Sequence, residues 1–425
     1  MDLLLIILIL GILAAGFQAW NIGANDVANA LGTSVGSKAL TFKKAIIIAA
    51  IFEFLGAVLV GSHVSDTLRK GIVDPAGFEG QPELLALAML AALLAAGTAL
   101  LVATLFALPI STTHSIVGAV VGVGLIALGP AAVDWPTVGQ VASSWIISPV
   151  AGGLAAFTIF TLLRRHIFNS PHPLKAFKRI SPLLIFSLVT VVGMSILFKG
   201  LKNLKLDLNF GEALPASMLI AGVVAGISYL LIRRIPEVKP LETNRFGTGQ
   251  LRAEFGSVEK VFMKMQVLSA CSMAFAHGSN DVANAIGPLA VIASVYQTGQ
   301  ATASDTIPMW VVLLGGVGIV IGLATYGYKV IQTIGQGITE LTPARGFAAE
   351  LAAATTILLG SKLGLPISTT HTLVGAVIGI GLAQGLEGVN RKVVINIINS
   401  WVMTVPFAAL VAIVIFQALR LVMGI

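Results

Sequence analysis

Two short polar motifs, each present twice, hold most of the side chains that could do chemistry in this chain. The first reads GANDVANALG and, 255 residues later, GSNDVANAIG, and its polar residues are Asn25, Asp26, Asn29, Asn280, Asp281 and Asn284. In each copy the two asparagines are four residues apart and share one helix face. Carboxylate and amide oxygens are the hard ligands that a small cation needs. We therefore interpret the copies as two symmetric cation sites; the alternative is that the asparagines only join neighbouring helices.

The second repeated motif, LPISTTH, starts at Leu108 and again 257 residues later at Leu365. Its proline does not fit a helix interior, and Ser or Thr directly after the isoleucine is a good N-cap, so each copy predicts the start of a helix. Free N–H groups at such a start, with hydroxyls beside them, suit a compact oxyanion. The candidate anion ligands are Ser111, Thr112, Thr113, Ser368, Thr369 and Thr370. The alternative is that these hydroxyls bond only to their own helix backbone.

A few other ionisable residues fall within apolar segments. His114 and His371 end the two copies of the second motif and could contact the anion, carry a proton or simply pack as neutral rings. Glu53 has no counterpart in the repeat and is a candidate ion ligand or proton carrier. Arg345 and Glu350 lie close together in sequence near the start of one segment, and we interpret them as a structural pair.

Membrane helices must position these residues. Of 425 residues, 56% are hydrophobic and 11% are charged, about half the charged share of a soluble domain, and the mean hydropathy is +0.94. The apolar residues form runs of roughly 20, the length that crosses a ~30 Å hydrocarbon core as a helix. We predict an all-α polytopic protein with about twelve spans: 3–22, 42–62, 84–108, 110–128, 138–163, 181–198, 213–232, 262–287, 309–331, 346–365, 366–386 and 393–420.

Some of these helices are expected to be discontinuous. From Leu3 to Gly36 a single helix would extend about 50 Å, well beyond a ~30 Å core. We predict a break between Gly23 and Asp26, where unwound backbone carbonyls would add to the cation site. The spans 110–128 and 366–386 are candidates for re-entrant helices.

The chain is an internal duplication. Besides the two motifs, Ser144-Trp145 returns as Ser400-Trp401 at an offset of 256. Each copy holds five predicted spans and two lie between the copies, so the second copy starts from the opposite face and has inverted topology. We divide the chain into an N-terminal repeat 1–163, a linker with two helices 164–261 and a C-terminal repeat 262–425.

The distribution of Lys and Arg predicts the orientation. With the N- and C-termini outside a cell membrane, nearly all basic loops lie on the cytoplasmic side, as the positive-inside rule requires. The connection with Lys199, Lys202 and Lys205 is the exception. The net charge of +7 then marks cytoplasmic loops and indicates no nucleic-acid partner. The single cysteine, Cys271, excludes an intrachain disulfide and a multi-cysteine metal site.

Both duplicated motifs resemble those of the inorganic phosphate transporter (PiT) family, whose members carry a GANDVANA-type and a P-[IV]-S-T-T-H sequence in each half. The resemblance covers nearly the whole chain outside the middle loops. It implies secondary active symport of phosphate with Na⁺ by alternating access, with H⁺ coupling or sulfate transport in some relatives. By position, it assigns function to Asn25, Asp26, Ser111, Thr112 and Thr113, and to Asn280, Asp281, Ser368, Thr369 and Thr370. In the second half Ala276-His277 replaces Asn21-Ile22 and Pro288 replaces Thr33, so the two ion sites need not be equivalent.

The two aspartates also bear on the substrate. Near neutral pH phosphate carries protons and sulfate carries none, so a site close to Asp26 and Asp281 accepts hydrogen bonds only from phosphate. The carboxylates would repel the anion unless they were neutralised, which makes bound cations part of the site and explains coupling.

Two other functions fit the residues less well. A channel would need a continuous polar pore, and few polar residues lie outside the motifs. A hydrolase built from Ser111, His114 and Asp26 would not be expected to carry its triad twice. We expect no enzymatic activity and no cofactor, with phosphate, Na⁺ as coupling ion and membrane lipid as partners; the sequence leaves a homodimer open.

Overall fold

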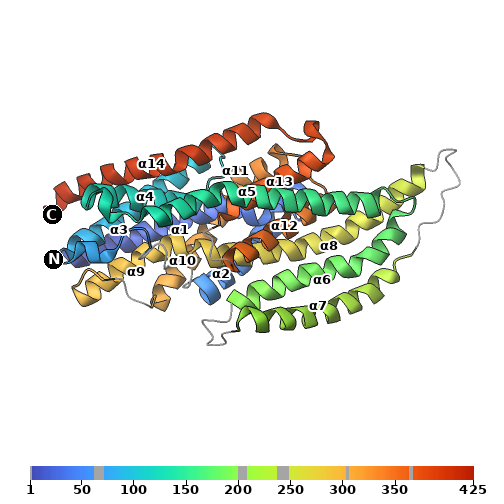
Figure 1. The fold of residues 1–425 in the computed structure, drawn as a ribbon, viewed down its shortest axis with the longest axis horizontal. Helices are drawn as coiled ribbons and strands as arrows, with labels where there is room; N and C mark the ends of the chain where they lie inside the picture. The colour runs from blue at the N-terminus through green and yellow to red at the C-terminus, as the bar shows by residue number, and fades with distance from the viewer. Residues whose placement is uncertain (1, 62–70, 200–207, 237–247, 303–305, 363–366) are drawn as a thin grey trace.

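The structure is a computed structural model that describes residues 2–61, 71–199, 208–236, 248–302, 306–362 and 367–425. Helices form nearly all the secondary structure of these residues. Figure 1 shows them lying side by side in one elongated bundle. The main helices are α1 Leu3–Gly36, α2 Phe42–Val60, α3 Pro82–Leu105, α4 Thr112–Ala127, α5 Trp135–Leu163, α6 Pro173–Lys199, α7 Phe210–Arg233, α8 Thr248–Asp281, α9 Ala283–Thr298, α10 Met309–Tyr326, α12 Pro343–Lys362, α13 Thr369–Gln384 and α14 Arg391–Met423. The all-α prediction is confirmed for these residues; Lys202, Lys205, Leu365 and Pro366 lie outside them.

Seven of the described helices are long and apolar enough to cross a membrane: α1, α3, α5, α6, α7, α10 and α14. The other five predicted spans overlap α2, α4, α8, α12 and α13. Each of α4 and α13 has 16 residues, about 24 Å of helix and less than a ~30 Å core, whereas α2 carries two lysines and Glu53. Of these five helices, α4, α8 and α13 carry motif residues, and a total of twelve spans stays a prediction.

α1 is one continuous helix of 34 residues, so the predicted break between Gly23 and Asp26 is wrong. Gly23 serves close packing instead, because a Cβ at this position would overlap the backbone carbonyl of Ile319 in α10. The backbone around Asn25 keeps its helical hydrogen bonds. Only side chains of α1 are therefore available to a ligand.

The second copy of this motif is interrupted by one residue. α8 ends at Asp281 and α9 begins at Ala283, while Val282 between them keeps right-handed helical angles of φ −56° and ψ −32°. Pro288 lies inside α9, and its missing N–H removes the bond that Asn284 would otherwise accept. α9 also continues to Thr298, into what was predicted as a connection.

Counterpart glycines interlock the two halves of the chain. α10 packs on α1, and α2 packs on α8. Gly23 meets the backbone of Ile319, and its counterpart Gly278 meets the backbone of Glu53, so closely in both cases that a Cβ would overlap the carbonyl oxygen. α1 carries the first copy of the first motif, and α8 carries the start of the second copy. Each of them thus lies directly against the helix that follows the motif in the other half.

The short helices exchange partners in the same way. α4 packs on α14 and α13 packs on α5. Gly118 of α4 touches the backbone of Val405, and its counterpart Gly375 of α13 touches the backbone of Pro149. Both pairings join one half to the other, so neither half forms its packing alone.

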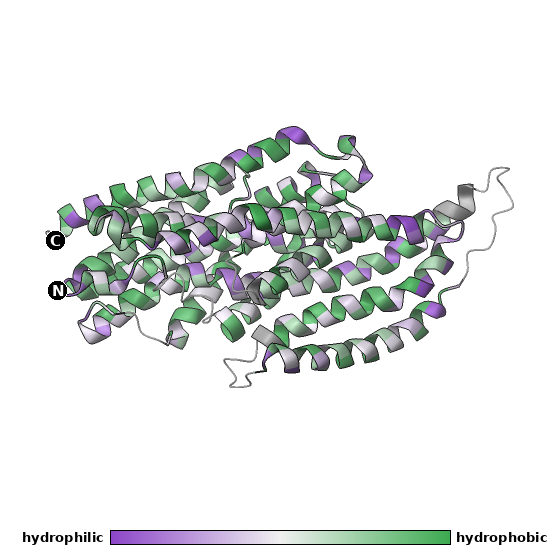
Figure 2. Cartoon of the chain, viewed as in Figure 1, coloured by the Kyte–Doolittle hydropathy of each residue, from purple (hydrophilic) through white to green (hydrophobic). Residues whose placement is uncertain are grey.

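The two chain termini lie at the same end of the bundle (Figure 1). α6 and α7 form an antiparallel pair at its edge. Figure 2 shows apolar residues along the helices and hydrophilic ones gathered toward many helix ends. Large apolar side chains face outward, such as Leu154 at 64% and Leu219 at 73% exposure, as expected for helices surrounded by lipid.

Candidate functional site

Ser111 and Ser368 begin the two short helices, as predicted. The Ser111 hydroxyl accepts the N–H of His114 at 3.3 Å, and the Ser368 hydroxyl accepts the N–H of His371 at 3.2 Å. The threonines that follow occupy the first two helical positions, whose backbone N–H groups have no partner within the helix. α4 and α13 therefore each present an open N-terminus with hydroxyls beside it.

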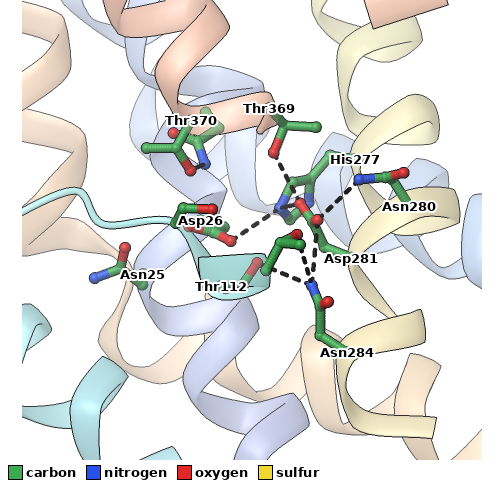
Figure 3. A network of polar contacts seen from close by, with 12 residues as sticks. Asn25, Asp26, Thr112, His277, Asn280, Asp281, Asn284, Thr369 and Thr370 are labelled. Atoms are coloured by element: carbon green, nitrogen blue, oxygen red, sulfur yellow. Dashed lines mark hydrogen bonds and ion pairs between the residues drawn. The ribbon is translucent and has the colours of Figure 1, made fainter. Parts of the chain in front are cut away.

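Asn25 holds the segment that leads into α4. Its side-chain nitrogen donates to the Thr104 hydroxyl at 2.9 Å and the Leu108 carbonyl at 3.1 Å, while its oxygen accepts the N–H of Ile110 at 3.3 Å. Both polar atoms of the amide are thus occupied by protein. Figure 3 shows Asn25 apart from the residues around Asp281, so the structure gives it a positioning contact and leaves its predicted role as a cation ligand untested.

We expect Asn25→Ala to weaken the hold on this segment. Loss of the three hydrogen bonds leaves the partly buried Leu108 carbonyl and the buried Ile110 N–H without their partner, at a cost of about 2 to 3 kcal/mol, while the Thr104 hydroxyl still donates to the Leu100 carbonyl at 2.8 Å. The melting temperature of the purified protein should fall. The exposed Asn396→Ala serves as control and should leave the melting temperature unchanged; equal behaviour of the two variants would contradict the positioning role.

The last asparagine of each copy of the first motif bonds to the N-terminus of α4 or α13 from the other half. The Asn29 side chain donates to the Thr370 hydroxyl at 2.7 Å. Its counterpart Asn284 donates to the hydroxyls of Thr112 at 3.1 Å and Thr113 at 3.4 Å. The predicted cation ligands and the predicted anion ligands are thus brought together, although they come from opposite halves.

Asp281 makes more polar contacts than the other residues of the two motifs (Figure 3). Its carboxylate accepts the Thr369 hydroxyl at 2.9 Å, the Asn280 side chain at 3.1 Å and the Asn284 side chain at 3.4 Å. The Nε2 atom of His277 lies 2.9 Å from the same carboxylate. Asp281 therefore joins α8, α9 and the N-terminus of α13.

His277 links Asp281 to two further carboxylates. Its Nε2 atom lies 3.6 Å from Asp26, and its Nδ1 atom lies 3.3 Å from Glu53. All four side chains are at most 1% exposed. We call Asp26, Glu53, His277 and Asp281 the carboxylate cluster. One ligand atom each from Asp26, His277 and Asp281 lie within 4.8 Å of one another, close enough for a single ion to touch all three.

The charges of this cluster do not balance. A single imidazole can supply one positive charge against three carboxylates. Neither oxygen of Asp26 forms a hydrogen bond of regular geometry with a described residue, although the Thr112 hydroxyl lies nearby, and neither oxygen of Glu53 forms one either. The imidazole therefore approaches them at ion-pair distance without forming aligned hydrogen bonds.

Sequence reasoning assigned no function to His277. His277 is present in the second copy only, and its counterpart in the first copy is Ile22. The signal that could have found it is the departure itself, because an ionisable side chain replaces an apolar one next to the repeated motif. Glu53 was predicted as an ion ligand or proton carrier from its position within an apolar segment, and the structure places it in the carboxylate cluster.

Glu350 and Arg345 do not form the predicted pair. The buried Glu350 carboxylate accepts hydrogen bonds from the side chains of Thr33 at 2.5 Å, Ser34 at 2.8 Å and Gln266 at 3.1 Å, and also from Ser269. The Arg345 guanidinium donates instead to the backbone carbonyl of Glu340 at 3.1 Å. Glu350 is thus well supplied with donors, in contrast to Asp26.

His114 and His371 lie in an aromatic cluster. Their rings meet edge to face at 4.5 Å; His114 lies 4.5 Å from the ring of Trp145, and His371 stacks on Trp401 at 3.7 Å. No ring nitrogen of the two histidines has a hydrogen-bond partner among the described residues. These contacts agree with the packing alternative, and direct contact with a substrate stays a prediction.

Comparison with known proteins shows the family of this chain. The model of the phosphate transporter family matches residues 22–412. The chain is 45% identical to a phosphate permease of Haemophilus influenzae over 95% of this chain and 94% of the relative. It is 46% identical to the chloroplastic inorganic phosphate transporter 2-1 of Arabidopsis thaliana, covering 94% and 70% of the two chains. A solved structure titled the sodium-dependent phosphate transporter aligns with a TM-score of 0.85 at 40% identity, covering 98% and 99%. The chain belongs to the phosphate transporter family.

Proposed function

We propose that this chain is a Na⁺-coupled symporter of inorganic phosphate whose cations bind at the carboxylate cluster. The observation that carries the proposal is the charge imbalance, in which three buried carboxylates share the single imidazole of His277. The likeness to a sodium-dependent phosphate transporter supports Na⁺ as the ion.

Cations would remove a large energetic penalty at the cluster. An uncompensated buried carboxylate costs several kcal/mol, and two opposite unit charges ~4 Å apart attract by about 4 kcal/mol at an effective dielectric constant of 20. Two monovalent cations would balance the three carboxylates when the imidazole is protonated. The Oδ1 atom of Asn29, which has no hydrogen-bond partner among the described residues, is a further ligand within reach of α13. Asn280 and Asn284 turn their nitrogens to Asp281, which leaves their oxygens for ions.

Phosphate would bind between the N-termini of α4 and α13. Thr112 is tied to Asn284 and Thr369 is tied to Asp281, so both helix starts lie close to the carboxylates. Free N–H groups and the positive ends of two helix dipoles favour an anion, and the bound cations would screen it from the aspartates. Protonated phosphate can donate hydrogen bonds to those aspartates, which sulfate cannot. Reciprocal linkage then requires phosphate to tighten Na⁺ binding.

Alternating access would use the two repeats, 1–163 and 262–425, as inverted units around the central site. The exchanged packing of α4 with α14 and of α13 with α5 supports this symmetry. We place both termini on the outer side of a cell membrane, with the linker 164–261 contributing α6, α7 and basic cytoplasmic loops.

Gradient-driven uptake tests the coupling. In proteoliposomes at fixed pH, an inward Na⁺ gradient should drive accumulation of labelled phosphate, whereas a pH gradient without Na⁺ should not. Excess sulfate should not compete. Uptake driven only by the pH gradient would mean that the carboxylate cluster binds protons instead of Na⁺. Competition by sulfate would mean that the protein accepts sulfate as well as phosphate.

A further inference from the structure

A groove lies between α6 and α7 at the edge of the bundle. It has a volume of about 660 Å³, and its apolar wall includes Leu183, Phe186, Gly222 and Gly226. Leu183 is 65% exposed, so the groove opens outward, away from the transport site. In a membrane this opening faces the acyl chains of the bilayer.

Two glycines create the hollow. Gly222 and Gly226 are four residues apart and therefore share one face of α7. A Cβ added at either position would meet nothing within 4 Å, unlike the glycines that interlock the two halves. The missing side chains leave room along α7 that no described residue fills.

One end of the groove is basic. Arg179 lines it, is exposed and forms no ion pair with a described residue, and Tyr229 lies opposite on α7. The Lys178 ammonium donates to the carbonyl of Ile235 at 2.6 Å, which ties the end of α7 to the start of α6. Glu254, an acidic residue near the start of α6, lies 4.0 Å from His172 and accepts the N–H of Leu174.

Further basic residues surround this end of the helix pair. Lys175, Arg233 and Arg234 are exposed there, within two turns of Arg179 or directly past Tyr229. The positive field of these side chains extends over the mouth of the groove and would attract an anionic headgroup. An apolar groove that begins at a cluster of cations is complementary in shape and charge to an anionic phospholipid.

We propose that this groove binds an anionic phospholipid, with the phosphodiester on Arg179 and one acyl chain over Gly222 and Gly226. Tyr229 lies where an amphipathic ring meets the headgroup region. A helix from a second copy would fill the apolar part but would bury the Arg179 charge without a partner, which is unfavourable. The charge therefore favours lipid over a second copy.

Native mass spectrometry of the purified full chain with matched phosphatidylglycerol and phosphatidylcholine tests the headgroup. Arg179→Ala should weaken phosphatidylglycerol binding about fivefold and leave phosphatidylcholine binding unchanged. Arg391→Ala removes an exposed positive charge at the start of α14 and should change neither. Equal loss in both variants, or none in Arg179→Ala, would overturn the proposal.

A second variant tests the acyl chain. Gly226→Leu fills the groove without a backbone clash and should weaken both lipids while the protein stays folded. Excess inorganic phosphate should not displace phosphatidylglycerol from the wild type; displacement would make Arg179 a site for free phosphate. A change of oligomeric state in Gly226→Leu with lipid binding intact would assign the groove to a second copy and reject the lipid.

Discussion

Asp26→Asn should abolish Na⁺-driven phosphate uptake while leaving the protein as stable as the wild type. The Asp26 carboxylate faces the His277 imidazole and the Thr112 hydroxyl, and neither of its oxygens forms a hydrogen bond of regular geometry with a described residue, so the isosteric amide can keep its oxygen toward the same donors. Its one ion pair with a described residue is to His277 at 3.6 Å, and that imidazole still contacts Asp281 and Glu53. Loss of a charged cation ligand worth about 3 kcal/mol corresponds to on the order of a 100-fold lower uptake at limiting Na⁺.

Two measurements on the same preparation separate function from folding. Labelled phosphate uptake into proteoliposomes gives the loss of transport, and thermal unfolding in detergent gives the stability. Asp134→Asn is the matched control, because Asp134 is an N-cap of α5 outside the site and Asn caps a helix as well as Asp does. Uptake by Asp26→Asn within threefold of the control would show that Asp26 does not hold the coupling ion.

Gly23→Val should prevent the assembly of α1 with α10. A Cβ at Gly23 would overlap the carbonyl of Ile319, and backbone atoms cannot rotate away as a side chain can. The helices would have to separate, at a cost of more than about 3 kcal/mol. We expect little monodisperse protein by size-exclusion chromatography and a markedly lower melting temperature in what remains.

Gly16→Val on the same helix is the control. A Cβ at Gly16 meets nothing within 4 Å, so the same change of side chain should be tolerated there. If Gly23→Val were recovered in wild-type yield and with wild-type stability, the close crossing of α1 and α10 would be wrong. Loss in both variants would mean that valine disfavours this helix for reasons other than packing.

The features predicted correctly from sequence are mostly local. Pro109 and Ser111 determine a helix start within three residues, and the structure has that start. The break near Gly23 was wrong because a glycine among polar residues fits both an unwound segment and a tight helix crossing, and only the neighbouring α10 decides between them.

Contacts between distant residues could not be read from sequence. Arg345 and Glu350 lie close along the chain, yet Glu350 bonds to Thr33, 317 residues away. The departure from the repeat at His277 indicates that the two halves differ, but it does not predict a role for this residue. His277 contacts a third carboxylate, Glu53, only because α2 lies against α8.

The bond between Asn29 and Thr370 joins positions 341 residues apart, which has a consequence for biosynthesis. At about 5 to 20 residues per second, the ribosome makes Thr370 roughly 20 to 70 s after Asn29. Throughout that interval α1 holds Asn29 in the bilayer before its partner Thr370 exists. The first half therefore matures only after the second half has been inserted, and a nascent chain that stops before residue 369 would present a polar helix face to membrane quality control.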